Sequence, residues 1–187
     1  MEMMDTMAKE DIVSINRSWQ LGRGIGKGDT PRVISPEVLG KLIKKAKRPL
    51  YVFGPSLLEA KYDDKLALDY AIEMAEAYNV PVVAVSHAIK GFLQKGFEPD
   101  AWMPAVNIVD RLRDSEWDGI REEGQHDLVV FFGVFCALGE QGLSTLRHFA
   151  PWLKTITICP RYHPSADMSV IIDGEKLNKL VETLRRD

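Results

Sequence analysis

The chain has 187 residues, of which 45% are hydrophobic and 27% charged, and its net charge is −3. This length and composition predict one globular domain with a substantial core, and the slightly acidic balance argues against a nucleic-acid partner. No apolar run approaches the roughly 18 residues of a membrane-spanning helix, and the acidic first residues lack the apolar stretch of a signal peptide. We therefore expect a cytoplasmic protein with no membrane partner.

Residues 1–34 show weak periodicity and carry a glycine cluster from Gly22 to Gly28. The cluster departs from the Walker phosphate loop, because three residues instead of four separate Gly22 from Gly26 and because Gly28 follows Lys27. We interpret residues 1–34 as a flexible N-terminal arm and residues 35–187 as a single Rossmann-like domain.

Helical and strand patterns alternate along the rest of the chain. The expected helices cover about 35–46, 63–78, 104–112, 143–150 and 177–186, and the expected strands cover 50–53, 82–85, 128–133, 155–159 and 168–172. The segment around 91–96 is expected to be irregular, because it contains two glycines. Such alternation is typical of βαβ units and predicts an α/β fold, a three-layer Rossmann-like sandwich with a mainly parallel sheet.

In a sheet of this kind, ligands bind beyond the carboxyl ends of the strands. Seven residues follow three of the predicted strands: Gly54, Pro55 and Ser56, then Ser86 and His87, then Gly133 and Val134. Their backbone amides could bind a diphosphate, so they form a candidate cofactor site for FAD or another nucleotide. The first turn has Gly54 but not the G-x-G-x-x-G fingerprint. His87 is the best-placed histidine for function, although a structural or exposed histidine is the simpler interpretation.

Catalytic motifs give little support for an enzyme. The sequence contains no G-x-S-x-G, H-E-x-x-H or C-x-x-C pattern. Cys136 and Cys159 lie in or beside apolar runs, which favours two buried free thiols; a redox pair would need a proximity that the sequence does not establish. Two cysteines cannot ligate a four-thiolate iron–sulfur cluster alone. We therefore expect no metal site, and an independent enzyme acting through His87 or Cys136 is the weakest hypothesis.

An ordered set of segments resembles the epsilon subunit of the archaeal acetyl-CoA decarbonylase/synthase complex. These segments are 42–54, which contains Ala-Lys-Arg-Pro-Leu, then 79–82, Gly91-Phe92, Trp117-Asp118-Gly119 and 126–133. Their order and spacing extend from about Ser35 to Val170. The chain is thus similar to that family over most of the predicted domain.

The resemblance implies a fold like the central FAD/NAD-binding domain of thiamine-diphosphate enzymes, with a sheet of about six strands. It implies a non-catalytic small subunit that binds the alpha subunit in an α2ε2 carbon monoxide dehydrogenase, whose nickel–iron–sulfur chemistry belongs to alpha. Epsilon would stabilise this assembly and assist electron transfer to FAD. The alternative is a flavin- or nucleotide-binding module outside this complex, and self-association is a further expectation.

Overall fold

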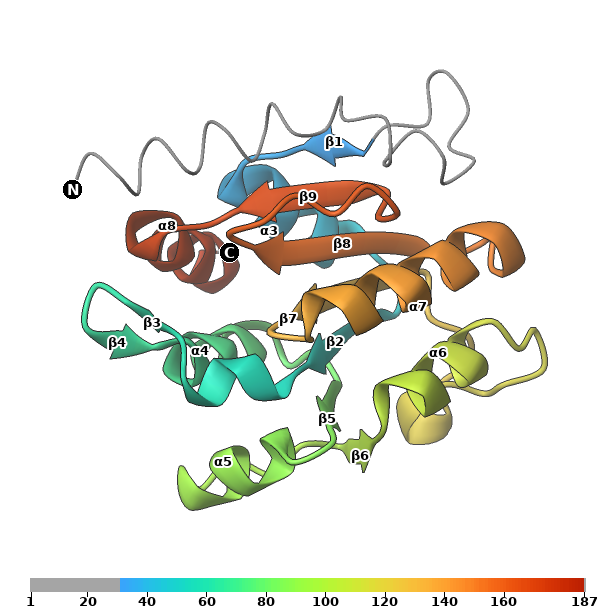
Figure 1. Cartoon of the computed structure of the whole chain (residues 1–187), viewed down its shortest axis with the longest axis horizontal. Helices are drawn as coiled ribbons and strands as arrows, with labels where there is room; N and C mark the ends of the chain where they lie inside the picture. Colours follow the sequence, from blue (N-terminus) through green and yellow to red (C-terminus); the bar gives the residue numbers. More distant parts are fainter. Residues whose placement is uncertain (1–30, 187) are drawn as a thin grey trace.

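The computed structural model describes residues 31–186, which form one seven-stranded sheet with helices on both faces (Figure 1). The strands of this sheet are β1 (Arg32–Val33), β2 (Pro49–Phe53), β5 (Val82–Val85), β6 (Ala101–Met103), β7 (Leu128–Phe132), β8 (Lys154–Cys159) and β9 (Met168–Ile171). Their order is β1-β9-β8-β7-β2-β5-β6, and every neighbouring pair is parallel. The predicted α/β class with a parallel sheet is confirmed.

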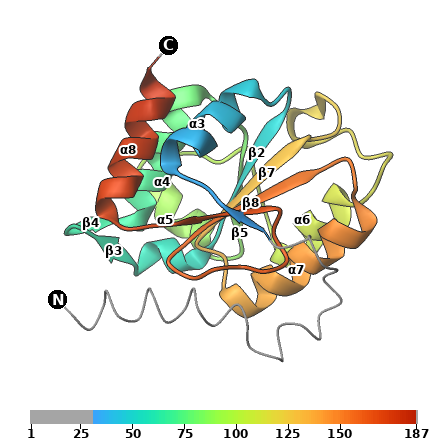
Figure 2. The same cartoon turned by 90° about the horizontal axis from the view of Figure 1, so that it is seen from above.

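Two groups of helices cover the sheet, one on each side (Figure 2). The helices are α3 (Pro36–Lys45), α4 (Ala67–Tyr78), α5 (Ala88–Gln94), α6 (Ala105–Leu112), α7 (Cys136–Phe149) and α8 (Gly174–Arg185). Tyr51 and Phe53 of β2 pack in one core with α3, α4, α5 and α8, whereas Leu50 and Val52 pack in a second core with α6 and α7. Because successive side chains of a strand point to opposite faces, this division makes the three-layer sandwich that the sequence predicts.

Local signals in the sequence explain several boundaries. The Ser35 side chain accepts a hydrogen bond from the amide of Val38, and Pro36 occupies the first turn of α3, as their residue types predict. Asp173 caps α8 in the same way, through the amide of Lys176. In the part of the chain that the structure describes, no helix is both long and apolar enough to cross a bilayer.

The prediction of one helix over 63–78 is wrong at its start. A small hairpin precedes α4, formed by β3 (Lys61–Tyr62) and β4 (Lys65–Leu66). Asp63 and Asp64 form its two-residue turn, with φ of 49° and 63°. Aspartate tolerates this left-handed conformation, and two such residues in succession match the twist of a hairpin. The acidic pair therefore makes a turn instead of a helix N-terminus.

Three further expectations need correction. The segment around 91–96 is mostly helical, because α5 runs to Gln94, and Gly91 allows close contact with Leu58. Strand β6 was not predicted; it is an edge strand of only three residues. The sheet therefore has seven strands instead of the expected six. Residues 1–30 of the predicted arm lie outside the described residues, but Arg32 and Val33 pair with β9 and belong to the sheet.

Candidate functional site

The topological switch point of the sheet lies between β2 and β7. From β2 the chain passes to β5 and β6 on one side, then returns to β7, β8 and β9 on the other. The carboxyl ends of β2 and β7, at Gly54 and Gly133, therefore meet at the place where open α/β sheets bind ligands. Gly54 and Gly133, two of the residues predicted to line a crevice, therefore lie side by side at the switch point.

At the switch point, however, the two chain segments contact each other. The amide of Gly54 donates to the carbonyl of Phe132 at 2.8 Å, and the amide of Ser56 donates to the carbonyl of Gly133 at 3.0 Å. A Cβ atom on Gly54 would lie 2.3 Å from the Gly133 carbonyl oxygen. Gly54 is thus needed for backbone-to-backbone packing, and these two amides are already occupied.

A small hollow lies beside this contact. Ser56, Gly133 and Val134 line it together with Cys159 and His163, and its volume is about 60 Å³. Ligand pockets usually have volumes of about 300 Å³ or more. The hollow is therefore small compared with a pocket for a flavin dinucleotide.

The remaining predicted site residues lie elsewhere or have structural roles. Ser86 and His87 follow β5, on the other side of β2, and neither lines the hollow. The amide of Ser86 donates to the carbonyl of Met103 at 3.2 Å, and His87 is an exposed residue that precedes α5. Pro55 begins the short 3₁₀ helix η2 (Pro55–Leu58). The seven residues therefore do not converge on one cavity.

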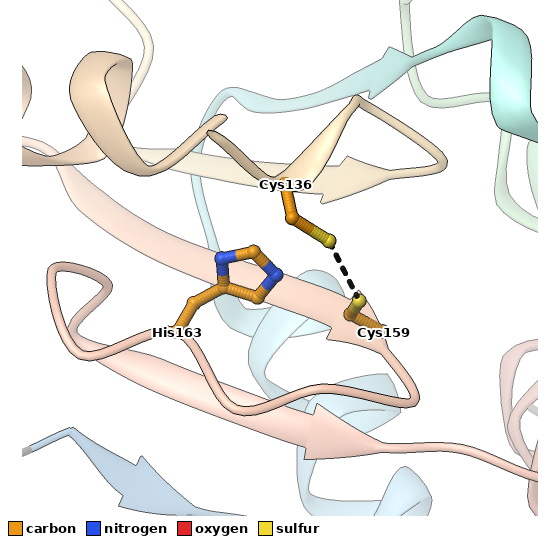
Figure 3. A group of neighbouring side chains, drawn as sticks. All are labelled: Cys136, Cys159 and His163. Carbon is orange, nitrogen blue, oxygen red and sulfur yellow. Dashed lines mark hydrogen bonds between the residues drawn. The ribbon is translucent and has the colours of Figure 1, made fainter. Parts of the chain in front are cut away.

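The structure instead brings together Cys136, Cys159 and His163 (Figure 3). The two sulfur atoms are 3.9 Å apart, and one ligand atom from each of the three residues lies within 4.8 Å of the others. Cys136 is the first residue of α7 and Cys159 the last residue of β8. Because β7 and β8 are parallel neighbours, their carboxyl ends lie side by side, and both cysteines are at this end of the sheet. The sequence led us to expect no metal site and did not indicate this group of three possible metal ligands.

Helix α7 holds the histidine of this cluster in place. Nδ1 of His163 is 2.9 Å from the Glu140 carboxylate, which also accepts the amide of Ser165 at 2.7 Å. Both His163 and Glu140 are buried. The guanidinium of Arg147 donates to the carbonyls of Pro164 and Ala166, each at 3.4 Å. With Nδ1 bonded to Glu140, the other ring nitrogen, Nε2, faces the sulfur atoms (Figure 3).

These contacts shift the pKa of each group. Hydrogen bonds from Cys159 and then from His163 lower the pKa of the Cys136 thiol to about 4, while the bond to Cys136 raises the pKa of Cys159. Burial lowers the pKa of His163, but hydrogen bonds to Cys136 and Glu140 outweigh it and raise this pKa to about 9. These shifts favour a thiolate at Cys136 beside an imidazolium at His163. The N-terminus of α7 and Arg161, 4.0 Å from the Cys136 sulfur, also favour the thiolate.

The sequence contains a signal for this cluster, but the signal can be recognised only when the order of the strands in the sheet is known. Cys136 follows one predicted strand, Cys159 ends the next, and His163 comes four residues later. Only the adjacency of β7 and β8 turns these separate positions into one site. His163 was overlooked because it lies in a loop with two prolines, where no periodic pattern marks it.

A second buried histidine, His126, has a structural role. Its Nδ1 lies 3.0 Å from the Arg48 carbonyl, and the amide of Ile120 donates to its Nε2 at 3.0 Å. The adjacent Asp127 carboxylate accepts the amides of Lys47 and Arg48, both at 2.9 Å. The Ala-Lys-Arg-Pro-Leu segment therefore anchors the loop before β7 to the start of β2.

The family model described as CO dehydrogenase beta subunit/acetyl-CoA synthase epsilon subunit matches residues 22–184. The epsilon subunit of the acetyl-CoA decarbonylase/synthase complex of Methanothermobacter thermautotrophicus is 41% identical over 137 residues, 73% of this chain and 76% of that one. The epsilon subunit of Methanothrix soehngenii is 36% identical over 135 residues, 72% of this chain and 70% of that one.

Among solved structures, one described as a thiamin diphosphate-dependent enzyme of Mycobacterium smegmatis aligns at a TM-score of 0.47 and 19% identity. It covers 79% of this chain and 27% of that chain. The match of the family model over most of the chain agrees with the segments that resemble the epsilon subunit. The chain belongs to the family of CO dehydrogenase beta subunits and acetyl-CoA synthase epsilon subunits.

Proposed function

We propose that this chain is the epsilon subunit of a cytoplasmic acetyl-CoA decarbonylase/synthase complex. In this proposal it is an accessory subunit that binds the alpha subunit of the carbon monoxide dehydrogenase component in an α2ε2 assembly and stabilises it. One observation carries the proposal: the epsilon-family model matches residues 22–184, and relatives that bear this name are 36–41% identical over 70–76% of their length.

The helical layer formed by α6 and α7 supports a docking role. These helices lie side by side on one face of the sheet (Figures 1 and 2). Five of the large exposed apolar side chains lie on this layer or next to it: Val106, Phe135, Leu138, Phe149 and Trp152. Val106 and Leu138 border a groove of about 190 Å³ between the two helices. Apolar surface of this kind typically marks a protein–protein contact, and we assign it to the alpha subunit.

The electron-transfer role that the resemblance implies finds no support in this geometry. A flavin cofactor would need room at the switch point, where the hollow is about 60 Å³ and the amides of Gly54 and Ser56 are already bonded. We therefore restrict the proposal to assembly and stabilisation.

Affinity capture of the tagged full chain from its native cells tests this function. We expect it to capture a large subunit that contains nickel and iron, seen by mass spectrometry and metal analysis. Native mass measurement of the captured assembly then gives its stoichiometry. Capture of no nickel–iron–sulfur partner, at any salt concentration, overturns the proposed function.

A matched pair of variants tests the docking surface separately. Val106 on α6 and Leu93 on α5 are both 55% exposed, so neither substitution by Asp disturbs the core. Val106→Asp places a charge in the apolar contact and should weaken capture by about tenfold or more, whereas Leu93→Asp should leave it unchanged. Equal capture by both variants would show that the alpha subunit binds another surface of the chain, and the subunit assignment would still stand.

A further inference from the structure

We propose that Cys136, Cys159 and His163 form a binding site for one thiophilic metal ion, with Zn²⁺ as the reference ion. The site is separate from the α6–α7 groove, and the inference does not depend on the proposed function. Two sulfurs and one imidazole form a donor set that zinc takes in proteins, with a fourth position left to water.

The spacing of the ligand atoms fits one ion. Two thiolates that bind zinc at about 2.3 Å with a tetrahedral angle lie about 3.8 Å apart. The sulfur atoms of Cys136 and Cys159 are 3.9 Å apart, so they need almost no movement. A zinc-bound sulfur and imidazole nitrogen lie about 3.5 Å apart. All three ligand atoms are within 4.8 Å of one another, so small rotations of the side chains close the site.

Glu140 orients the ring of His163 for metal binding. The bond between Nδ1 and the carboxylate, at 2.9 Å, leaves Nε2 directed toward the two sulfurs (Figure 3). Metal-binding histidines typically donate their other ring N–H to a carboxylate in this way, which fixes the ring and makes it a stronger ligand. The amide of Ser165 holds the carboxylate at 2.7 Å, and Glu140 is buried.

A small hollow lies beside two of the three proposed ligands. Cys159 and His163 both line this space of about 60 Å³, which accommodates a metal-bound water. Three protein ligands and one open position are typical of zinc sites that bind an exogenous group. Both cysteines of the chain are in the cluster, so the chain offers no further thiolate to close it.

Binding of the ion is a ligand exchange without redox chemistry. Two metal–sulfur bonds and one metal–nitrogen bond form, and any protons carried by the two thiols and by Nε2 of His163 pass to solvent. Two thiolates balance the charge of a divalent ion, and Arg161 remains beside Cys136. Binding should therefore release protons and strengthen as the pH rises.

The test uses the reduced full chain after removal of metal by a chelator. Titration with Zn²⁺ against a chromophoric chelator should give one tight site per chain. Co²⁺ should give the intense visible bands of tetrahedral coordination and a thiolate-to-cobalt charge-transfer band. Cys136→Ser and Cys159→Ser should each weaken zinc binding by about 100-fold, and the charge-transfer band should diminish.

Two more variants separate coordination from general structural effects. Glu140→Gln removes the carboxylate behind the imidazole and should weaken zinc binding by about 10–100-fold while tetrahedral cobalt bands persist. His87→Gln, at an exposed histidine outside the cluster, should bind as the wild type does. Circular dichroism checks that each variant is folded. The proposal fails if the reduced chain binds neither ion, if Cys159→Ser binds like the wild type, or if the cysteines form only a disulfide whose reduction restores no metal binding.

Discussion

At the scale of single residues, His126 shows how a buried side chain makes stability depend on pH. Burial is the main cause that lowers its pKa below the usual 6.5, and its neutral ring bonds two backbone groups. The unfolded chain therefore binds a proton below about pH 6.5 that the folded chain does not. The contribution of His126 to stability is complete above this pH and is lost as the pH falls toward the lower folded pKa.

We predict that His126→Asn costs about 1–3 kcal/mol of unfolding free energy at pH 7.5, because buried backbone groups lose their partners. The difference between wild type and variant should shrink at pH 5.5, and urea unfolding at both pH values measures it. The pKa of His163 is raised to about 9, so its contribution to stability is lost as the pH rises above 6.5. Comparing the variant with the wild type at each pH cancels this effect and isolates His126. A difference that is independent of pH would contradict the assigned protonation.

At the scale of elements, the contact between the ends of β2 and β7 decides what the switch point can do. A Cβ atom on Gly54 would meet the Gly133 carbonyl oxygen at 2.3 Å, and backbone atoms cannot rotate away. We predict that Gly54→Ala destabilises the fold by about 1–3 kcal/mol, as overpacking does.

Gly139 in α7 offers a matched control on a neighbouring element. A Cβ atom there has no neighbour closer than 3.7 Å, and alanine favours a helix over glycine by up to about 1 kcal/mol. Gly139→Ala should therefore be neutral or stabilising in the same urea experiment. Equal stability of Gly54→Ala and the wild type would show that the strand ends can separate, and would reopen this position to a ligand.

At the scale of the whole molecule, the alternative of a flavin-binding module can be tested directly. We predict no heat of binding when FAD is titrated into the full chain at high micromolar concentration, because the hollow of about 60 Å³ is too small for a dinucleotide. Isothermal titration calorimetry measures this, with ADP as a second titrant for the nucleotide half. Saturable binding of either compound would contradict the prediction and support a nucleotide site on this chain.

The fold could be predicted from the sequence to a large extent. Apolar runs such as Leu128–Phe132 are strands buried on both faces, and Ser35 and Pro36 mark a helix start through interactions with nearby residues. Errors occurred where short-range signals compete: Asp63 and Asp64 suit a helix N-terminus and also a hairpin turn. The candidate site was predicted less well, since Ser86 and His87 do not line the hollow beside Gly133.

By itself the sequence determined the class of fold, the approximate elements and, through the segments around Arg48, the family. These properties depend on local periodicity, capping and ordered motifs, which a linear chain displays. Only the tertiary structure decided that the ends of β2 and β7 close on each other and that Cys136, Cys159 and His163 meet. The physical reason is that both results follow from the order of the strands in the sheet, which long-range packing selects and no short segment encodes.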